Sequence, residues 1–150
     1  MELKNQVCTL EQGKRLYELI EKDTESLFVH WLTIENEDYV WKIGTLNEAG
    51  NATESYPAYT VAELGEMLPD EYLKNFEFEG YVIPKSGKYT QSFETWFFNG
   101  DNGRQFGCRY DYNGNINIAT PNFFGTEAQA RAELLIYLLE QRLITPNQQK

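Results

Sequence analysis

The sequence predicts an α+β protein in which an antiparallel β-meander sheet packs against a long C-terminal helix, with an N-terminal helix and a short middle helix. Three Thr-x-x-Glu or Thr-x-x-Gln capping signatures each precede an apolar stretch with helical spacing. Between them lie runs rich in aromatic and β-branched residues, joined by short turn segments. This order is typical of the α+β class and not of repeated βαβ units. We expect residues 1–150 to form a single domain with a frayed tail over residues 145–150.

The capping signatures place the predicted helices, and they begin at Thr9, Thr60 and Thr126. The first opens a helix over residues 10–22, which Gly13 weakens by about 1 kcal/mol relative to alanine. The second opens a short helix that Pro69 ends. The third opens a helix over residues 127–143 whose apolar positions extend well beyond one stripe. We therefore expect this last helix to lie deep against a sheet.

Six runs rich in aromatic and β-branched residues are predicted as strands. They cover residues 27–34, 39–43, 76–83, 89–98, 104–112 and 115–119. The acidic turn at residues 35–38 makes the first two runs a hairpin. Turn segments such as PKSG at residues 84–87 make the later runs antiparallel neighbours. Residues 44–59 show no period, so we expect a surface loop or disorder there, with a functional loop as the alternative.

The Asn-Gly turn at residues 113–114 predicts how the last two strands pair. A two-residue turn sets Tyr112 opposite Asn115 and Tyr110 opposite Asn117. These four side chains are our candidate interaction surface, an aromatic and amide patch suited to a flat polar ligand or a partner protein. The alternative is a hairpin tip in which the tyrosines lean on the core and the asparagines are solvated.

The negative charge of the chain is concentrated in its first half. The net charge over 150 residues is −10, with 17 acidic and 6 basic residues at positions 1–80 against 6 and 7 at positions 81–150. Such acidity repels a nucleic-acid backbone, and no apolar run is long enough to span a bilayer, so we expect no nucleic-acid partner and no membrane. The acidic half is either a solvated surface or a docking site for a basic partner. Because the sequence shows no signal peptide, we expect a cytoplasmic protein.

Few residues of the sequence suit catalysis. His30 is the single histidine, and alternation along its strand gives it apolar neighbours, which favours a core position over a catalytic one. Cys8 and Cys108 fit no metal or redox spacing and are expected to be inert thiols, with one disulfide as the alternative. The sequence holds no phosphate-binding glycine loop and too few His and Cys residues for a zinc site. A glycosidase-type pair of carboxylates is defined by distance and stays open.

Three segments of the sequence carry a resemblance. They read VCTLEQGKRL at residues 7–16, PAYTVAELGEMLP at residues 57–69, and EAQARA followed by LIYLLE within residues 127–140. The chain resembles small proteins of unknown function encoded by phages, prophages and related mobile elements of gut anaerobic bacteria. The resemblance implies a cytoplasmic, phage-type origin. It brings no activity, cofactor or functional residue with it.

The sequence favours one function and leaves two alternatives open. The favoured function is a non-catalytic accessory or interaction protein of a phage or mobile element, acting through the acidic half or the meander. The first alternative is a small carboxylate-based hydrolase, which needs a pocket with two close acids. The second is a module that binds a polar, sugar-like small molecule at the candidate interaction surface. We expect a protein partner, no cofactor and no metal, and an exposed apolar patch would favour a homo-oligomer.

Overall fold

The computed structural model describes residues 2–20, 25–68, 71–78, 81–97, 104–112, 116–119 and 124–144. The α+β class predicted from the sequence is confirmed within these residues. In chain order the elements are η1 (a 3-10 helix) Leu3–Asn5, α1 Leu10–Leu19, β1 Phe28–Glu35, β2 Asp38–Thr45, α2 Leu46–Ala49, β3 Ser55–Pro57, α3 Val61–Met67, β4 Glu71–Phe78, β5 Tyr81–Phe97, β6 Arg104–Tyr112, β7 Ile116–Ala119 and α4 Glu127–Glu140.

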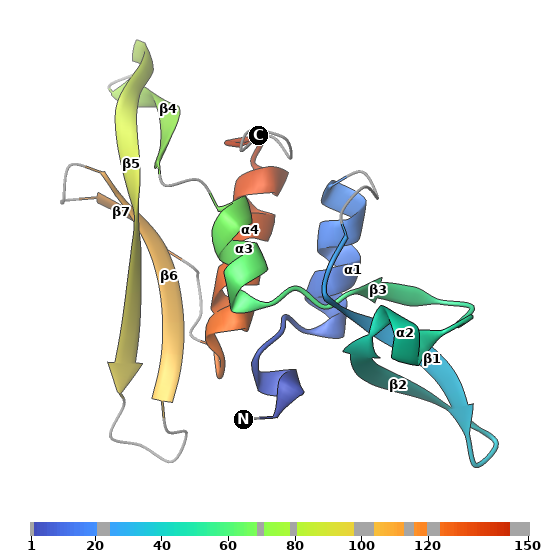
Figure 1. The fold of residues 1–150 in the computed structure, drawn as a ribbon. Coiled ribbons are helices and arrows are strands. Elements are labelled where there is room, and N and C mark those ends of the chain that lie inside the picture. The colour runs from blue at the N-terminus through green and yellow to red at the C-terminus, as the bar shows by residue number, and fades with distance from the viewer. Residues whose placement is uncertain are drawn as a thin grey trace.

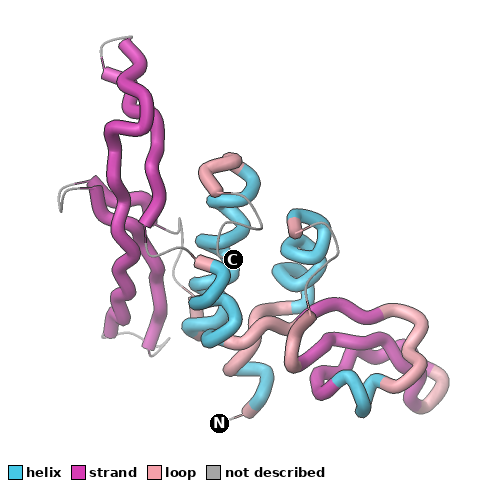
Figure 2. Tube along the Cα trace, turned by 45° about the horizontal axis from the view of Figure 1, so that its top comes forward, coloured by secondary structure: helices cyan, strands magenta, loops and turns pink. Residues whose placement is uncertain are grey.

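Two antiparallel sheets lie on either side of the helices (Figure 1). The first sheet has the strand order β2-β1-β3, and the second is the meander β4-β5-β6-β7. Helices α1, α3 and α4 lie between the two sheets in both views of the chain (Figures 1 and 2). Helix α4 contacts β6, α1 and α3, while α1 also contacts β3. The predicted meander packed against the C-terminal helix is therefore confirmed.

Helix α4 is the centre of the hydrophobic core. Its buried residues are Ala128, Ala130, Ala132, Leu134, Leu135, Ile136, Leu138 and Leu139. Because these residues occupy several sides of the helix, no single sheet face can cover them all. Leu16 of α1 and Leu64 of α3 are fully buried in the same cluster. The core is therefore formed by the elements that cover α4. Burial of each such leucine contributes about 1.5–3 kcal/mol to the stability of the fold.

The predicted end of this helix, at residue 143, is wrong by three residues. Arg142 adopts a left-handed φ of 56°, and its N–H donates to the carbonyl oxygen of Leu139 at 3.1 Å. The N–H of Leu143 donates to the carbonyl oxygen of Leu138 at 2.9 Å. This pair of bonds is a Schellman motif, which ends a helix and is usually built on glycine. Since arginine holds the glycine position, the sequence contains no stop signal there.

Residues 44–59, expected to be a surface loop or disorder, contain a helix and a strand. Thr45 and Glu48 form a capping box that opens α2, just as the predicted boxes at Thr9 and Thr60 open α1 and α3. Further along, β3 pairs antiparallel with β1. The Thr-x-x-Glu spacing of Thr45 and Glu48 was an available signal, and it was missed because a four-residue helix shows no apolar period after its cap. The three-residue strand is likewise too short to show a period.

The predicted first hairpin is confirmed. Strands β1 and β2 pair without a bulge over eight residues each. Asn36 and Glu37 form the turn, and their φ values of 51° and 69° are the left-handed values of a type I′ turn, which matches the twist of the strands. The resulting register sets Ile34 opposite Tyr39.

The predicted strand over residues 76–83 is wrong, because the chain reverses direction within it. Strands β4 and β5 pair antiparallel, with Phe78 opposite Tyr81. The PKSG segment at residues 84–87, expected to be a turn, lies inside β5 instead. The β4–β5 register shifts opposite this segment. Proline cannot donate a ladder hydrogen bond, so it is accommodated at such an irregularity.

Gly13 allows α1 to approach β3 closely. A Cβ atom on Gly13 would overlap the backbone carbonyl oxygen of Pro57. We therefore expect Gly13→Ala to lower the free energy of unfolding by about 1–2 kcal/mol, because overpacking outweighs the helix propensity that alanine gains.

Gly65→Ala in α3 is the matched control for this prediction. There a Cβ atom would meet only the end of the flexible Arg131 side chain. The free energy of unfolding of this variant should be unchanged or higher, since alanine favours helix by up to about 1 kcal/mol over glycine. Urea denaturation measures both variants, and a stability gain in Gly13→Ala would contradict the close approach.

Candidate functional site

The predicted interaction surface lies on the meander, with a register that differs from the expected one. The surface was defined by Tyr110, Tyr112, Asn115 and Asn117. Asn115 lies outside the described residues, and the other three belong to β6 and β7. Tyr110 pairs with Ile118 and Asn117 pairs with Asp111. The predicted pairings of Tyr112 with Asn115 and of Tyr110 with Asn117 are wrong, because Tyr112 pairs with Ile116 and three residues rather than two separate the paired strands. The surface itself stays a prediction.

His30 is a core residue, as predicted. Only 3% of the residue is exposed, and its Nε2 atom lies 3.0 Å from the backbone oxygen of Cys8. Because a carbonyl oxygen can only accept, Nε2 carries the proton and donates it. Burial holds the pKa of His30 below its usual value, and the hydrogen bond to Cys8 opposes this shift. The ring is therefore neutral and structural at neutral pH.

Cys8 is unsuited to nucleophilic catalysis. Its side chain is buried and free of any disulfide, and burial raises the pKa of the Cys8 thiol to about 12. A catalytic cysteine needs a lowered pKa and a base beside its sulfur. His30 instead contacts the main-chain oxygen of Cys8. Over the described part of the chain, no group of three or more His, Cys, Asp and Glu residues could hold a metal ion.

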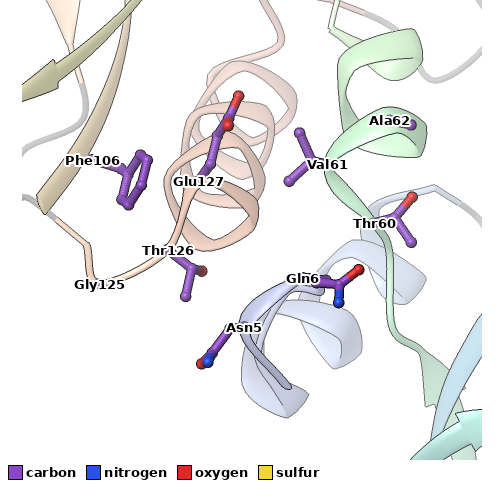
Figure 3. A pocket seen from close by; sticks show the side chains of 9 residues that line it. All are labelled: Asn5, Gln6, Thr60, Val61, Ala62, Phe106, Gly125, Thr126 and Glu127. Carbon is purple, nitrogen blue, oxygen red and sulfur yellow. The ribbon is translucent and has the colours of Figure 1, made fainter. Parts of the chain in front are cut away.

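A cleft of about 680 Å³ opens where α3 and α4 begin (Figure 3). It is lined by Asn5, Gln6, Thr60, Val61, Ala62, Phe106, Gly125, Thr126 and Glu127. Glu127 is the one carboxylate among these nine residues, and Arg131 forms an ion pair with it at 2.6 Å. The hydroxyls of Thr60 and Thr126 cap the two helices. The described lining of this cleft therefore offers one carboxylate, where a glycosidase-type mechanism needs two close acids.

An apolar stripe on the first sheet runs from the core into solvent. Alternate residues of a strand share one face, so His30, Leu32 and Ile34 lie on the same side of β1. The exposed fraction rises along this side from 3% at His30 to 64% at Ile34. Tyr39, which lies opposite Ile34 on β2, is 75% exposed. Two large apolar side chains are therefore neighbours at the outer end of the hairpin.

The inner end of the stripe is covered by α1. The ring centroids of Trp41 and Tyr56 lie 6.1 Å apart, and Tyr17 of α1 meets Tyr56 edge-on at 5.8 Å. The Nζ atom of Lys14 lies 5.0 Å from the centroid of the Trp41 ring. Helix α1 lies over the start of β1, and the turn between β1 and β2 projects away from it (Figure 1). The stripe is thus anchored at one end and open at the other.

Carboxylates accompany the exposed apolar pair. Glu35, Glu37 and Asp38 lie in or beside the turn and are exposed. Glu35 pairs with Lys42 at 3.2 Å, whereas Glu37 and Asp38 have no ion-pair partner among the described residues. Residues 25–68 as a whole contain eight acidic residues and one basic residue. We use the name hairpin tip for Ile34, Glu35, Glu37, Asp38 and Tyr39.

The hairpin and its acidic turn were predictable from the sequence, but the apolar pair at the tip was missed. The available signal was the two-residue turn. Glu35 and Asp38 flank this turn, so Ile34 and Tyr39 form the next pair across the strands. Their exposure had no signal in the sequence. His30 and Ile34 occupy equivalent positions in the alternating pattern, and only the placement of α1 decides which of them is covered.

Comparisons with protein-family models, curated proteins and solved structures find no match to this chain. Among the helices that the structure describes, none combines the length and the apolar character needed to cross a membrane. The function of the chain is therefore inferred from the geometry and charge of its described residues.

The buried neutral state of His30 should make stability depend on pH. The folded-state pKa lies below the unfolded value of about 6.5, so the unfolded state binds more protons near and below that pH. The free energy of unfolding should therefore fall as the pH drops below about 6.5, by at most about 1.4 kcal/mol per pH unit from this group.

The variant His30→Gln isolates this contribution. Glutamine offers an N–H donor to the backbone oxygen of Cys8 and does not titrate. Urea denaturation at several pH values between about 5.5 and 8 should show a smaller fall in stability for the variant than for the wild type. Identical pH profiles for the two proteins would contradict a buried, neutral His30.

Proposed function

We propose that this protein is a non-catalytic interaction protein that binds a partner protein through the hairpin tip. The observation that carries the proposal is the exposed pair Ile34 and Tyr39, which are adjacent across the strands and flanked by carboxylates. Adjacent exposed apolar side chains mark interaction sites more often than single scattered ones do. Tyrosine is also enriched at binding hot spots, because its rigid ring buries a large area at low entropy cost.

The carboxylates indicate the chemistry of the partner. Glu37 and Asp38 are exposed, and residues 25–68 carry a net charge of −7. The field of this segment attracts basic groups and repels acidic ones, which raises the association rate of a basic partner. Each exposed ion pair adds only about 0–1 kcal/mol, so the apolar pair supplies most of the affinity. The partner should therefore present apolar side chains flanked by lysine or arginine.

The alternative functions have less support. A carboxylate-based hydrolase needs two close acids, whereas Glu127, paired with Arg131, is the one carboxylate among the described residues that line the cleft beside α3 and α4. The binding of a sugar-like molecule at the meander stays a prediction. So do the cytoplasmic location and the origin in a phage or mobile element, and binding at the hairpin tip does not depend on them.

Selection from a random library of displayed peptides tests the hairpin tip. We expect the immobilised protein to enrich peptides in which apolar residues are flanked by lysine or arginine. The double variant Ile34→Ser, Tyr39→Ser should bind the selected peptides at least about 10-fold more weakly, since each buried apolar side chain contributes about 1.5–3 kcal/mol. Calorimetric titration of a selected peptide gives the affinities.

Leu27→Ser is the matched control for the double variant. Leu27 is 68% exposed, as much as the residues of the tip, but it precedes the opposite end of β1. This variant should bind the selected peptides as the wild type does. The hairpin tip is excluded as the binding surface if the double variant keeps full affinity, or if the control loses as much.

Removing the two unpaired carboxylates tests the role of charge. The variant Glu37→Gln, Asp38→Asn keeps the shape of the tip and should lower the association rate constant several-fold at low salt, with little change in the dissociation rate. The difference should disappear at about 1 M salt, where the Debye length is about 3 Å. Glu66→Gln, at an exposed position on α3, is the control. An equal effect of both substitutions in surface plasmon resonance would argue against a local role of the tip.

A further inference from the structure

Strand β2 has an open edge beside the hairpin tip. It is the outer strand of the order β2-β1-β3, and no strand of the described residues pairs with its other side. η1 contacts β2 and lies near its C-terminal end, away from the turn of the hairpin (Figure 1). Proteins commonly block such edges with proline, bulges or lysine. β2 contains neither a proline nor a bulge, and its single lysine, Lys42, forms an ion pair with Glu35 of β1 at 3.2 Å.

Alternate residues of β2 direct their backbone groups outward. In an antiparallel pair, every second residue directs its N–H and C=O toward the partner strand. The N–H of Leu32 donates to the oxygen of Glu54, on the β3 side, at 3.0 Å. Even-numbered residues of β1 thus face β3, and odd-numbered residues bond to the even-numbered residues of β2. The backbone groups that point to the open edge are those of Tyr39, Trp41 and Ile43.

We infer that the partner segment binds as an added strand along β2. The inference rests on the proposed function, because it describes how the segment that docks on the hairpin tip is held. The side chains of Tyr39, Trp41 and Ile43 lie on the face of the apolar stripe. An added strand with apolar residues at alternate positions would extend that face, while its backbone would bond to the open edge.

The length and charge of β2 define the segment further. Three outward-facing residues and their flanks match a strand of about seven residues, or roughly 23 Å. Glu37 and Asp38 lie at one end of β2, and Glu48 follows its other end. A basic side chain at the first end would meet two carboxylates that have no ion-pair partner among the described residues, and one at the other end would approach Glu48, which also accepts from the N–H of Thr45. The structure fits an extended segment with apolar residues at alternate positions and lysine or arginine at each end.

A second copy of this chain is the other occupant that an open edge admits. Pairing β2 of one copy with β2 of another would bring together two copies of residues 25–68, each with eight acidic residues and one basic residue. Like charges placed across paired strands destabilise the pairing. Charge therefore favours a basic segment of another protein over self-association.

Two N-methylated forms of one peptide test strand addition. The probe is a seven-residue peptide that alternates isoleucine or valine with threonine and carries lysine at each end. One form is methylated on its even-numbered amides and the other on its odd-numbered amides, so that each loses the donors of one edge only. In calorimetric titration of the wild-type protein, we expect one form to bind at least 10-fold more weakly than the unmodified peptide and the other within about 3-fold.

Each outcome separates the added strand from the proposed function. Equal affinities for the two methylated forms, or no binding of the unmodified peptide, would overturn strand addition, while the display selection would still decide the role of the hairpin tip. Unchanged binding of the unmodified peptide to Ile34→Ser, Tyr39→Ser would count against the tip, and a difference between the methylated forms would still support the edge. A concentration-dependent dimer in analytical ultracentrifugation, dissociated by the peptide, would show that a second copy occupies the edge and would overturn the inference.

Discussion

The burial of α4 is the constraint on which the rest of the structure depends. Eight of its fourteen residues are buried, and they occupy several sides of the helix, so β6, α1 and α3 must cover it together. Gln12 ties α1 to α4, because its Nε2 atom donates to the backbone oxygen of Gln129 at 3.0 Å and to a carboxylate oxygen of Glu133 at 3.1 Å. A helix held against α4 in this way can cover only part of the first sheet.

The shape of the hairpin tip follows from this placement. An α-helix is about 10–12 Å wide with its side chains, whereas an eight-residue strand is about 26 Å long. Helix α1 lies over the start of β1 (Figure 1). Gly13 of this helix lies beside the buried ring of His30, whereas Ile34, further along the strand, is 64% exposed. The close approach at Gly13 fixes this position, since moving the helix along the sheet would bring a residue with a Cβ atom against the carbonyl oxygen of Pro57. The exposed apolar pair is thus a consequence of how the core is covered.

Local signals explain which parts of the fold could be predicted. The capping threonines and the type I′ turn act within four residues, so α1, α3, α4 and the first hairpin were predictable from the sequence. The helix stop at Arg142 uses a residue that rarely adopts a positive φ, so no local signal marks it. The pairing of Phe78 with Tyr81 divides a run of residues that alternation alone predicts as one strand. The candidate site was predictable to the same extent. The acidic turn is a local feature, whereas the exposure of Ile34 depends on α1, a distant segment of the chain.

The acidic residues of the hairpin and the open edge of β2 are physically related. An uncharged edge strand with exposed apolar side chains would pair with copies of itself, which is how such edges lead to aggregation. Carboxylates at the ends of β2 oppose that pairing, because two copies would place like charges close together. The same carboxylates attract a segment of opposite charge. The carboxylates that oppose pairing of β2 with a second copy of β2 are therefore also the groups that select a basic strand. One charge pattern accounts for the low tendency to self-associate and for the choice of partner.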